Sequence, residues 1–211
     1  MNHTRATCSI AILLLLFFCG LAEARYNMAV DERVYRFSDY RSKHRCPYTL
    51  QISIIEDNRP RWERGYISGT HFFTYDRLWS QPISVMMERV LVKEFKGSGI
   101  FRGVVKGNKN TNLVLKIKLY SFYGKVMMRK KSWLREFLFN YIYGQTKLNA
   151  TLVSRGAEKV YMEKDYKGTI SRKVGVLRNQ YGHAATAAGR SFEKVVGELL
   201  KDVEHSLIKR R

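Results

Sequence analysis

The sequence predicts an α+β fold in which a mostly antiparallel sheet carries two helices packed on one face. Segments with an apolar residue at every second position follow one another with short polar turns between them, which is typical of antiparallel strands. Two other segments have apolar residues three and four apart, which is typical of amphipathic helices. With 211 residues, 45% of them hydrophobic, the chain has enough apolar material for one domain with its own core.

The first 24 residues precede this pattern and differ from it. Arg5 is followed by an unbroken apolar stretch over residues 10–19, and Ala22-Glu23-Ala24 is a small-residue cleavage site. This order is typical of a secretory signal peptide, and the apolar stretch is too short to span a membrane as a helix. We therefore expect residues 1–24 to be a signal peptide and the protein to be exported. An uncleaved anchor is the alternative.

Cys19 raises a further alternative, because a lipoprotein signal also ends in a cysteine. Bulky Phe17 and Phe18 stand directly before it, and such a signal prefers small residues there. We therefore favour cleavage after Ala24 and keep lipidation of Cys19 as the second interpretation.

Residues 25–47 are charged and aromatic with little periodicity, and we expect an extended N-terminal arm there. Residues 48–211 then form a single α+β domain. Its first strand is expected over residues 48–55, because Leu50, Ile52 and Ile54 fall on one face. Turn residues 56–60, which include Pro60, end that strand.

Residues 61–80 are irregular and rich in aromatic side chains. One interpretation is a loop that contacts a ligand or partner, and the other is a set of rings packed over the edge of the core. The candidate residues of this loop are Trp62, Tyr66, Phe72, Tyr75 and Trp79.

A helix is expected after Pro82, with one apolar stripe from Ile83 to Phe95 and an end at residues 97–99. Residues 100–105 and 113–120 are expected to be strands, and the second alternates clearly between Leu and Lys. Residues 133–143 favour a strand over a short helix because they are aromatic and β-branched.

The remaining expected elements are a hairpin and a long helix. Residues 147–153 and 159–166 alternate on either side of a turn that contains Gly156, which predicts the hairpin. Residues 167–182 are polar and are expected to be a loop. Residues 184–208 carry a continuous apolar stripe and are expected to form the closing helix.

The sequence shows no pattern that would carry catalysis or hold a metal. The five His residues are far apart, and no nucleophile motif, phosphate-binding loop or paired-cysteine motif occurs. Gly97-Ser98-Gly99 follows a helix, whereas a phosphate cradle opens one. We predict no catalytic residue, no metal and no cofactor, so the chain is not expected to be an enzyme.

Positive charge is the other feature that calls for an explanation. The chain has 38 Lys+Arg against 18 Asp+Glu, a formal net charge of +20. Such an excess attracts anionic lipids, glycans or nucleic acid at long range, although runs of charge often only solvate a surface. The best candidate cluster for binding an anionic ligand is Lys116, Lys118, Lys125, Arg129, Lys130 and Lys131. Export and the absence of a nucleic-acid-binding motif argue against nucleic acid as the partner.

The order of elements resembles small envelope proteins of Gram-negative bacteria. These are the auxiliary lipoproteins of ABC-type transporters (the PqiC-like group) and the YajG-like lipoproteins. The matching features are an Asp-x-Arg-Pro element at Asp57–Pro60, a Tyr-x-x-x-Trp-x-x-Pro element from Tyr75 to Pro82, and an Ala-rich closing helix.

The resemblance covers roughly residues 48–208. It implies a non-enzymatic periplasmic accessory protein of envelope lipid transport or assembly, in some members attached to the outer membrane. It implies an envelope protein complex as partner, and the basic cluster then suggests contact with anionic lipid or lipopolysaccharide. The mature chain would have no transmembrane span. A secreted effector or enzyme that acts on an anionic polymer is the alternative.

Overall fold

The computed structural model describes residues 35–64, 72–73, 79, 81–106, 110–127, 140–156, 159–174 and 180–209. The predicted signal peptide and Cys19 lie outside these residues. In the described part, six strands form one sheet in the order β3-β1-β4-β5-β6, with β2 paired to β4.

The first half of the sheet is built around β1 (Cys46–Asp57), which begins two residues before the predicted strand. The chain then passes through α3 (Ile83–Ser98) and returns as β3 (Phe101–Lys106), parallel to β1. The predicted apolar stripe of α3 is buried, and the helix ends at Gly99, whose φ of 73° is left-handed.

The second half of the sheet consists of three long strands that pair antiparallel. They are β4 (Leu113–Met127), β5 (Asn140–Ser154) and β6 (Val160–Val174). The predicted hairpin is confirmed by β5 and β6. However, β6 continues to Val174, so the loop expected from residue 167 is wrong there. Pairing with β5 supplies the backbone hydrogen bonds whether or not the side chains are polar.

The expected mostly antiparallel sheet with two helices packed on one face is wrong. The sheet is mixed, because β1 is parallel to both of its neighbours, β3 and β4. The described residues also contain a third helix, α2 (Arg61–Arg64). Short turns suggested antiparallel neighbours, but consecutive strands need not pair: β3 and β4 follow one another in the chain and lie on opposite sides of β1.

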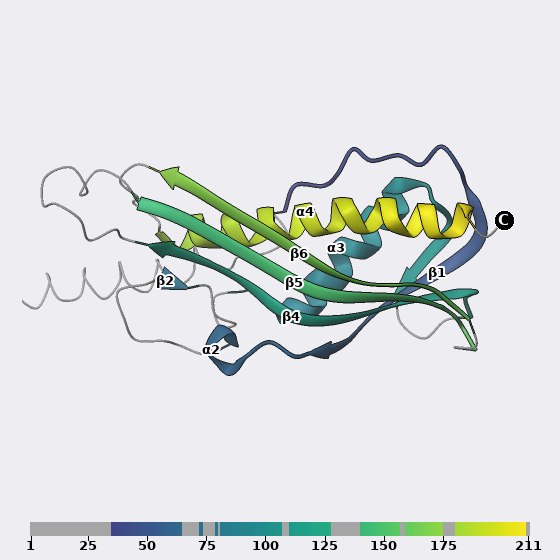
Figure 1. Cartoon of the computed structure of the whole chain (residues 1–211), viewed down its shortest axis with the longest axis horizontal. Helices are drawn as coiled ribbons and strands as arrows, with labels where there is room; N and C mark the ends of the chain where they lie inside the picture. Colours follow the sequence, from purple (N-terminus) through teal and green to yellow (C-terminus); the bar gives the residue numbers. More distant parts are fainter. Residues whose placement is uncertain are drawn as a thin grey trace, which may run out of the picture.

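Helix α4 (Gln180–Ile208) runs along the length of β4, β5 and β6 (Figure 1). Its apolar stripe joins the inward residues of the sheet and of α3 in one core cluster. None of the helices in the described part of the chain is both long and apolar enough to cross a membrane.

Part of the predicted arm packs on the helices. The Tyr35 hydroxyl donates to Glu94 of α3 at 2.7 Å, and the Ser38 amide donates to the same carboxylate oxygen at 2.6 Å. The Ser42 hydroxyl donates to Glu204 of α4 at 2.7 Å. The arm is therefore held along α3 and α4 before the chain enters β1.

Candidate functional site

The face of the sheet opposite α4 carries the candidate site. We call it the outer face and define it by the residues of β4, β5 and β6 that alternate with the core residues. Cross-strand pairs place Lys116 beside Thr151, Lys118 beside Asn149 and Lys125 beside Tyr143. The outer face therefore carries lysine, tyrosine, small polar and two acidic side chains. Its residues on the three strands are Lys116, Lys118, Ser121, Tyr123 and Lys125; Tyr143, Gln145, Lys147, Asn149 and Thr151; and Glu163, Asp165, Lys167, Thr169 and Ser171.

Three residues of the predicted basic cluster lie on this face. Lys118 Nζ is 3.7 Å from the Glu56 carboxylate, and both side chains are about half exposed. Lys125 Nζ lies 5.1 Å from the centre of the Tyr143 ring. Lys116 and Lys125 are nine positions apart on one strand, roughly 30 Å, so these lysines form a stripe. Arg129, Lys130 and Lys131 lie outside the described residues.

The structure separates the residues of the predicted aromatic loop. Trp62 of α2 is 43% exposed and its ring lies 5.3 Å from that of Tyr123 on the outer face. Trp79 is buried in the core, where its ring lies 5.2 Å from that of Phe122, and it cannot face a surface ligand. Phe72 forms β2 (Phe72–Phe73), which pairs with β4. Tyr66 and Tyr75 lie outside the described residues.

A polar network fixes α2 on the outer face. Buried Glu63 accepts hydrogen bonds from the Ser121 hydroxyl at 2.7 Å and from the Phe122 amide at 2.8 Å. The Gln145 amide donates to Ser121, and the Tyr143 hydroxyl donates to Gln145. Burial raises the pKa of Glu63, although the hydrogen bonds from Ser121 and Phe122 act in the opposite direction.

The same surroundings affect Tyr123, which lies between Trp62 and Tyr143. Burial, with a smaller effect from Tyr143 and Glu63, raises its pKa to about 12. Its hydroxyl therefore stays protonated at alkaline pH as well as at neutral pH.

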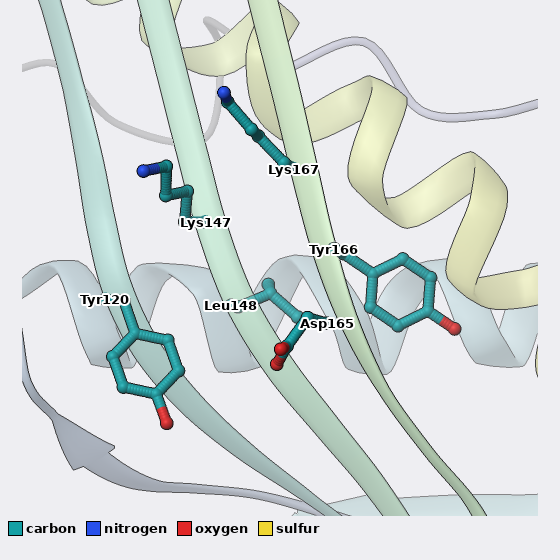
Figure 2. Close-up of a pocket in the computed structure, with 6 residues that line it drawn as sticks. All are labelled: Tyr120, Lys147, Leu148, Asp165, Tyr166 and Lys167. Carbon is teal, nitrogen blue, oxygen red and sulfur yellow. The ribbon is translucent and has the colours of Figure 1, made fainter.

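A pocket of about 370 Å³ opens on the outer face next to this network. It is lined by Tyr120, Lys147, Leu148, Asp165, Tyr166 and Lys167. Figure 2 shows the two lysine ammonium groups on one side of the pocket and the Tyr120 ring and Asp165 carboxylate on the other. Tyr166 points away toward α4, where its hydroxyl donates to Asp202 at 2.9 Å.

The sequence did not single out Lys147, Asp165 or Lys167. The alternation of residues 147–153 and of 159–166 indicates which side chains face away from the core. Only the pairing of Lys147 with Lys167 across β5 and β6 brings the two charges together. Within the described residues, no three His, Cys, Asp or Glu side chains are grouped as metal ligands.

No family model matches the chain, and no curated protein is similar to it in sequence. Solved structures are similar in fold. A DUF330-family protein from Xanthomonas campestris superposes with a TM-score of 0.57 at 15% identity, covering 84% of this chain and 97% of the other. A minor lipoprotein from Acinetobacter baumannii has a TM-score of 0.41 at 6% identity, covering 74% and 92%. The chain thus shares its fold with the Xanthomonas protein.

Proposed function

We propose that this chain is a non-enzymatic accessory or binding protein of the Gram-negative envelope. It contacts anionic lipid or lipopolysaccharide through its outer face and works in the periplasm with an envelope protein complex. The fold that this chain shares with the DUF330 protein supports the general part of this proposal, an accessory or binding protein of the envelope.

One observation carries the ligand proposal: lysines from all three long strands lie on the outer face. Lys116, Lys118 and Lys125 of β4 are joined there by Lys147 of β5 and Lys167 of β6. A basic, partly aromatic face can lie against an anionic membrane surface, where each lysine contributes about 1 kcal/mol. Exposed tyrosine and tryptophan rings suit the polar–apolar boundary of a lipid layer.

Charge reversal of the β4 stripe tests this proposal. In the triple variant Lys116→Glu, Lys118→Glu and Lys125→Glu, we expect affinity for phosphatidylglycerol vesicles to fall at least about 100-fold, since three favourable lysine contributions are lost. The residual binding should also depend less on salt. Vesicle co-sedimentation at low and high ionic strength measures both effects.

The matched control reverses three exposed lysines on the arm, on α4 and directly after α4, in the variant Lys43→Glu, Lys201→Glu and Lys209→Glu. It changes the net charge by the same amount and should retain much more of the vesicle binding. If the two variants lose binding equally, the outer face is not the contact surface. If the β4 variant binds like the wild type, lipid contact through this stripe is wrong.

A further inference from the structure

Lys147 and Lys167 stand directly opposite each other in the β5–β6 pairing, on the rim of the pocket. Like charges in directly opposed positions destabilise a sheet. Among the described residues, neither ammonium group makes a hydrogen bond or an ion pair with a side chain. The fold therefore holds two positive charges without an ion-pair partner among the described residues at one end of a cavity, where an anion would relieve their repulsion.

The other end of the pocket has a different chemistry. The register shifts between Leu119 and Ser121, so Tyr120 sits in a β-bulge, and the residue is 42% exposed. Bulges re-aim side chains in this way. The ring offers a flat apolar surface beside the cavity (Figure 2).

Asp165 completes this end. Its Oδ1 accepts a hydrogen bond from the Asn149 amide at 2.8 Å, which orients the carboxylate and leaves Oδ2 to accept another donor. A carboxylate repels a second anion and accepts hydrogen bonds from hydroxyl groups. The pocket thus suits a ligand with an anionic group at one end and hydroxyl donors on a ring at the other.

We propose that this pocket binds a phosphorylated sugar. The phosphate lies between Lys147 and Lys167, the sugar ring stacks on Tyr120, and a sugar hydroxyl donates to Asp165. Charge-assisted bonds from two lysines provide most of the attraction, and the ring and carboxylate provide the selection for a sugar. This inference deepens the proposed function and rests on it, because it assigns the headgroup chemistry that the outer face would select.

The test uses soluble probes and isothermal titration of the purified mature chain. N-acetylglucosamine 1-phosphate should bind at least 10-fold more tightly than either inorganic phosphate or N-acetylglucosamine. The variant Lys147→Gln, Lys167→Gln should lose at least 10-fold in affinity for the sugar phosphate, whereas the variant Lys147→Arg, Lys167→Arg should keep most of it. Tyr120→Ala should weaken binding of the sugar phosphate and leave that of phosphate unchanged.

The control variant Lys43→Gln, Lys201→Gln removes the same number of charges from the arm and α4. If this control loses as much affinity as the variant Lys147→Gln, Lys167→Gln, or if the wild type binds the sugar phosphate no more tightly than phosphate, the pocket proposal is wrong.

Wild-type binding to phosphatidylglycerol vesicles separates the pocket proposal from the membrane proposal. If vesicles still bind while the sugar phosphate does not, only the pocket fails. If the sugar phosphate binds and vesicles do not, the membrane proposal fails.

Two sources could supply this ligand, a lipid-linked headgroup or a free sugar phosphate. Retention of the chain on vesicles that contain lipopolysaccharide, competed by free N-acetylglucosamine 1-phosphate, supports the lipid-linked source. Binding of the free compound without any effect on vesicle retention supports a soluble one. If free N-acetylglucosamine 1-phosphate still competes with these vesicles for the variant Lys147→Gln, Lys167→Gln, the assignment of Lys147 and Lys167 is wrong.

Discussion

The residue that best explains a sequence motif is Arg59, which is large, charged and only 2% exposed. Its guanidinium contacts both carboxylate oxygens of Asp57, with Nε 2.8 Å from Oδ1 and Nη2 2.7 Å from Oδ2. Burial would raise the pKa of Asp57, but the hydrogen bonds and charge of Arg59 outweigh it and lower that pKa below its usual 3.8. The Asp-x-Arg-Pro element is therefore a structural device at the end of β1.

Removing the charge of Asp57 tests this role. Asp57→Asn should lower the free energy of unfolding by about 2 kcal/mol at pH 7, because the buried guanidinium of Arg59 loses its charge-assisted bonds to Asp57. The partial exposure of Asp57 keeps the loss below that expected for a fully buried ion pair. A lowered native-state pKa gives stability that is present above the unfolded-state value and is lost as the pH falls through the native-state value. The destabilisation should therefore be largest at neutral pH and shrink as the pH falls through the native-state pKa of Asp57, as measured by urea unfolding over a series of acidic pH values.

Asp39→Asn is the matched control, since Asp39 is exposed on the arm. It should change stability by less than about 0.5 kcal/mol. A variant at Asp57 whose destabilisation is independent of pH would contradict the ion-pair interpretation.

At the scale of elements, the close approach of α4 to the sheet depends on three glycines. Gly124, Gly144 and Gly168 lie on neighbouring strands, and a Cβ on any of them would overlap the backbone of α4. Facing them are the small residues Ala184, Ala187 and Ser191. The Ser191 hydroxyl also bonds that of Thr146 at 2.7 Å in the buried interface. The helix therefore packs backbone to backbone on the sheet.

Gly144→Ala should disrupt this packing. The added methyl group meets the carbonyl of Ala187, and helix backbone cannot yield as a flexible side chain can. We expect a loss of about 3 kcal/mol in the free energy of unfolding, the upper range for overpacking. Thermal and urea unfolding monitored by circular dichroism measure the change.

Gly197→Ala, in α4 itself, provides the opposite control. A Cβ there meets nothing within 4 Å, so the substitution should stabilise the protein by up to about 1 kcal/mol through helix propensity. Equal effects of the two substitutions would show that the glycines on the sheet are not needed for close approach.

At the scale of the whole molecule, the two faces of the sheet differ in what they contact. One face holds α4 and the core, and the outer face carries the lysines, the aromatic rings and the pocket. With a formal charge of +20, the chain as a whole attracts anionic surfaces, and the outer face gives that attraction a defined contact area.

Export is the prediction that belongs to this scale. When the full chain is expressed in a Gram-negative host, the intact mass of the product should match a chain that starts at Arg25, because the Ala-x-Ala site precedes that residue. The product should fractionate with the envelope. A lipid-bearing mass that begins at Cys19 would instead establish the lipoprotein interpretation. Recovery of the protein in the medium would contradict the periplasmic proposal and favour a secreted effector.

Several elements could be predicted because their patterns are local. Alternation identified the buried side of β1 and β4 and the β5–β6 hairpin, and helical spacing identified α3 and α4. These patterns work because each side chain's burial follows from the repeat of its own element. The same reasoning placed Lys116 and Lys118 on the outward side, whereas Lys125 reaches that side only because the β-bulge between Leu119 and Ser121 shifts the alternation.

Only the tertiary structure decided which segments become neighbours. The parallel pairing of β1 with β3 and β4, the extension of β6 to Val174 and the seating of α2 on Ser121 depend on partners distant in the chain. The pocket has the same origin, since the β5–β6 register sets Lys147 against Lys167. By itself, the sequence determined the sidedness of each element, because burial repeats locally. Pairing and register required the fold, because they arise from packing between segments far apart in sequence.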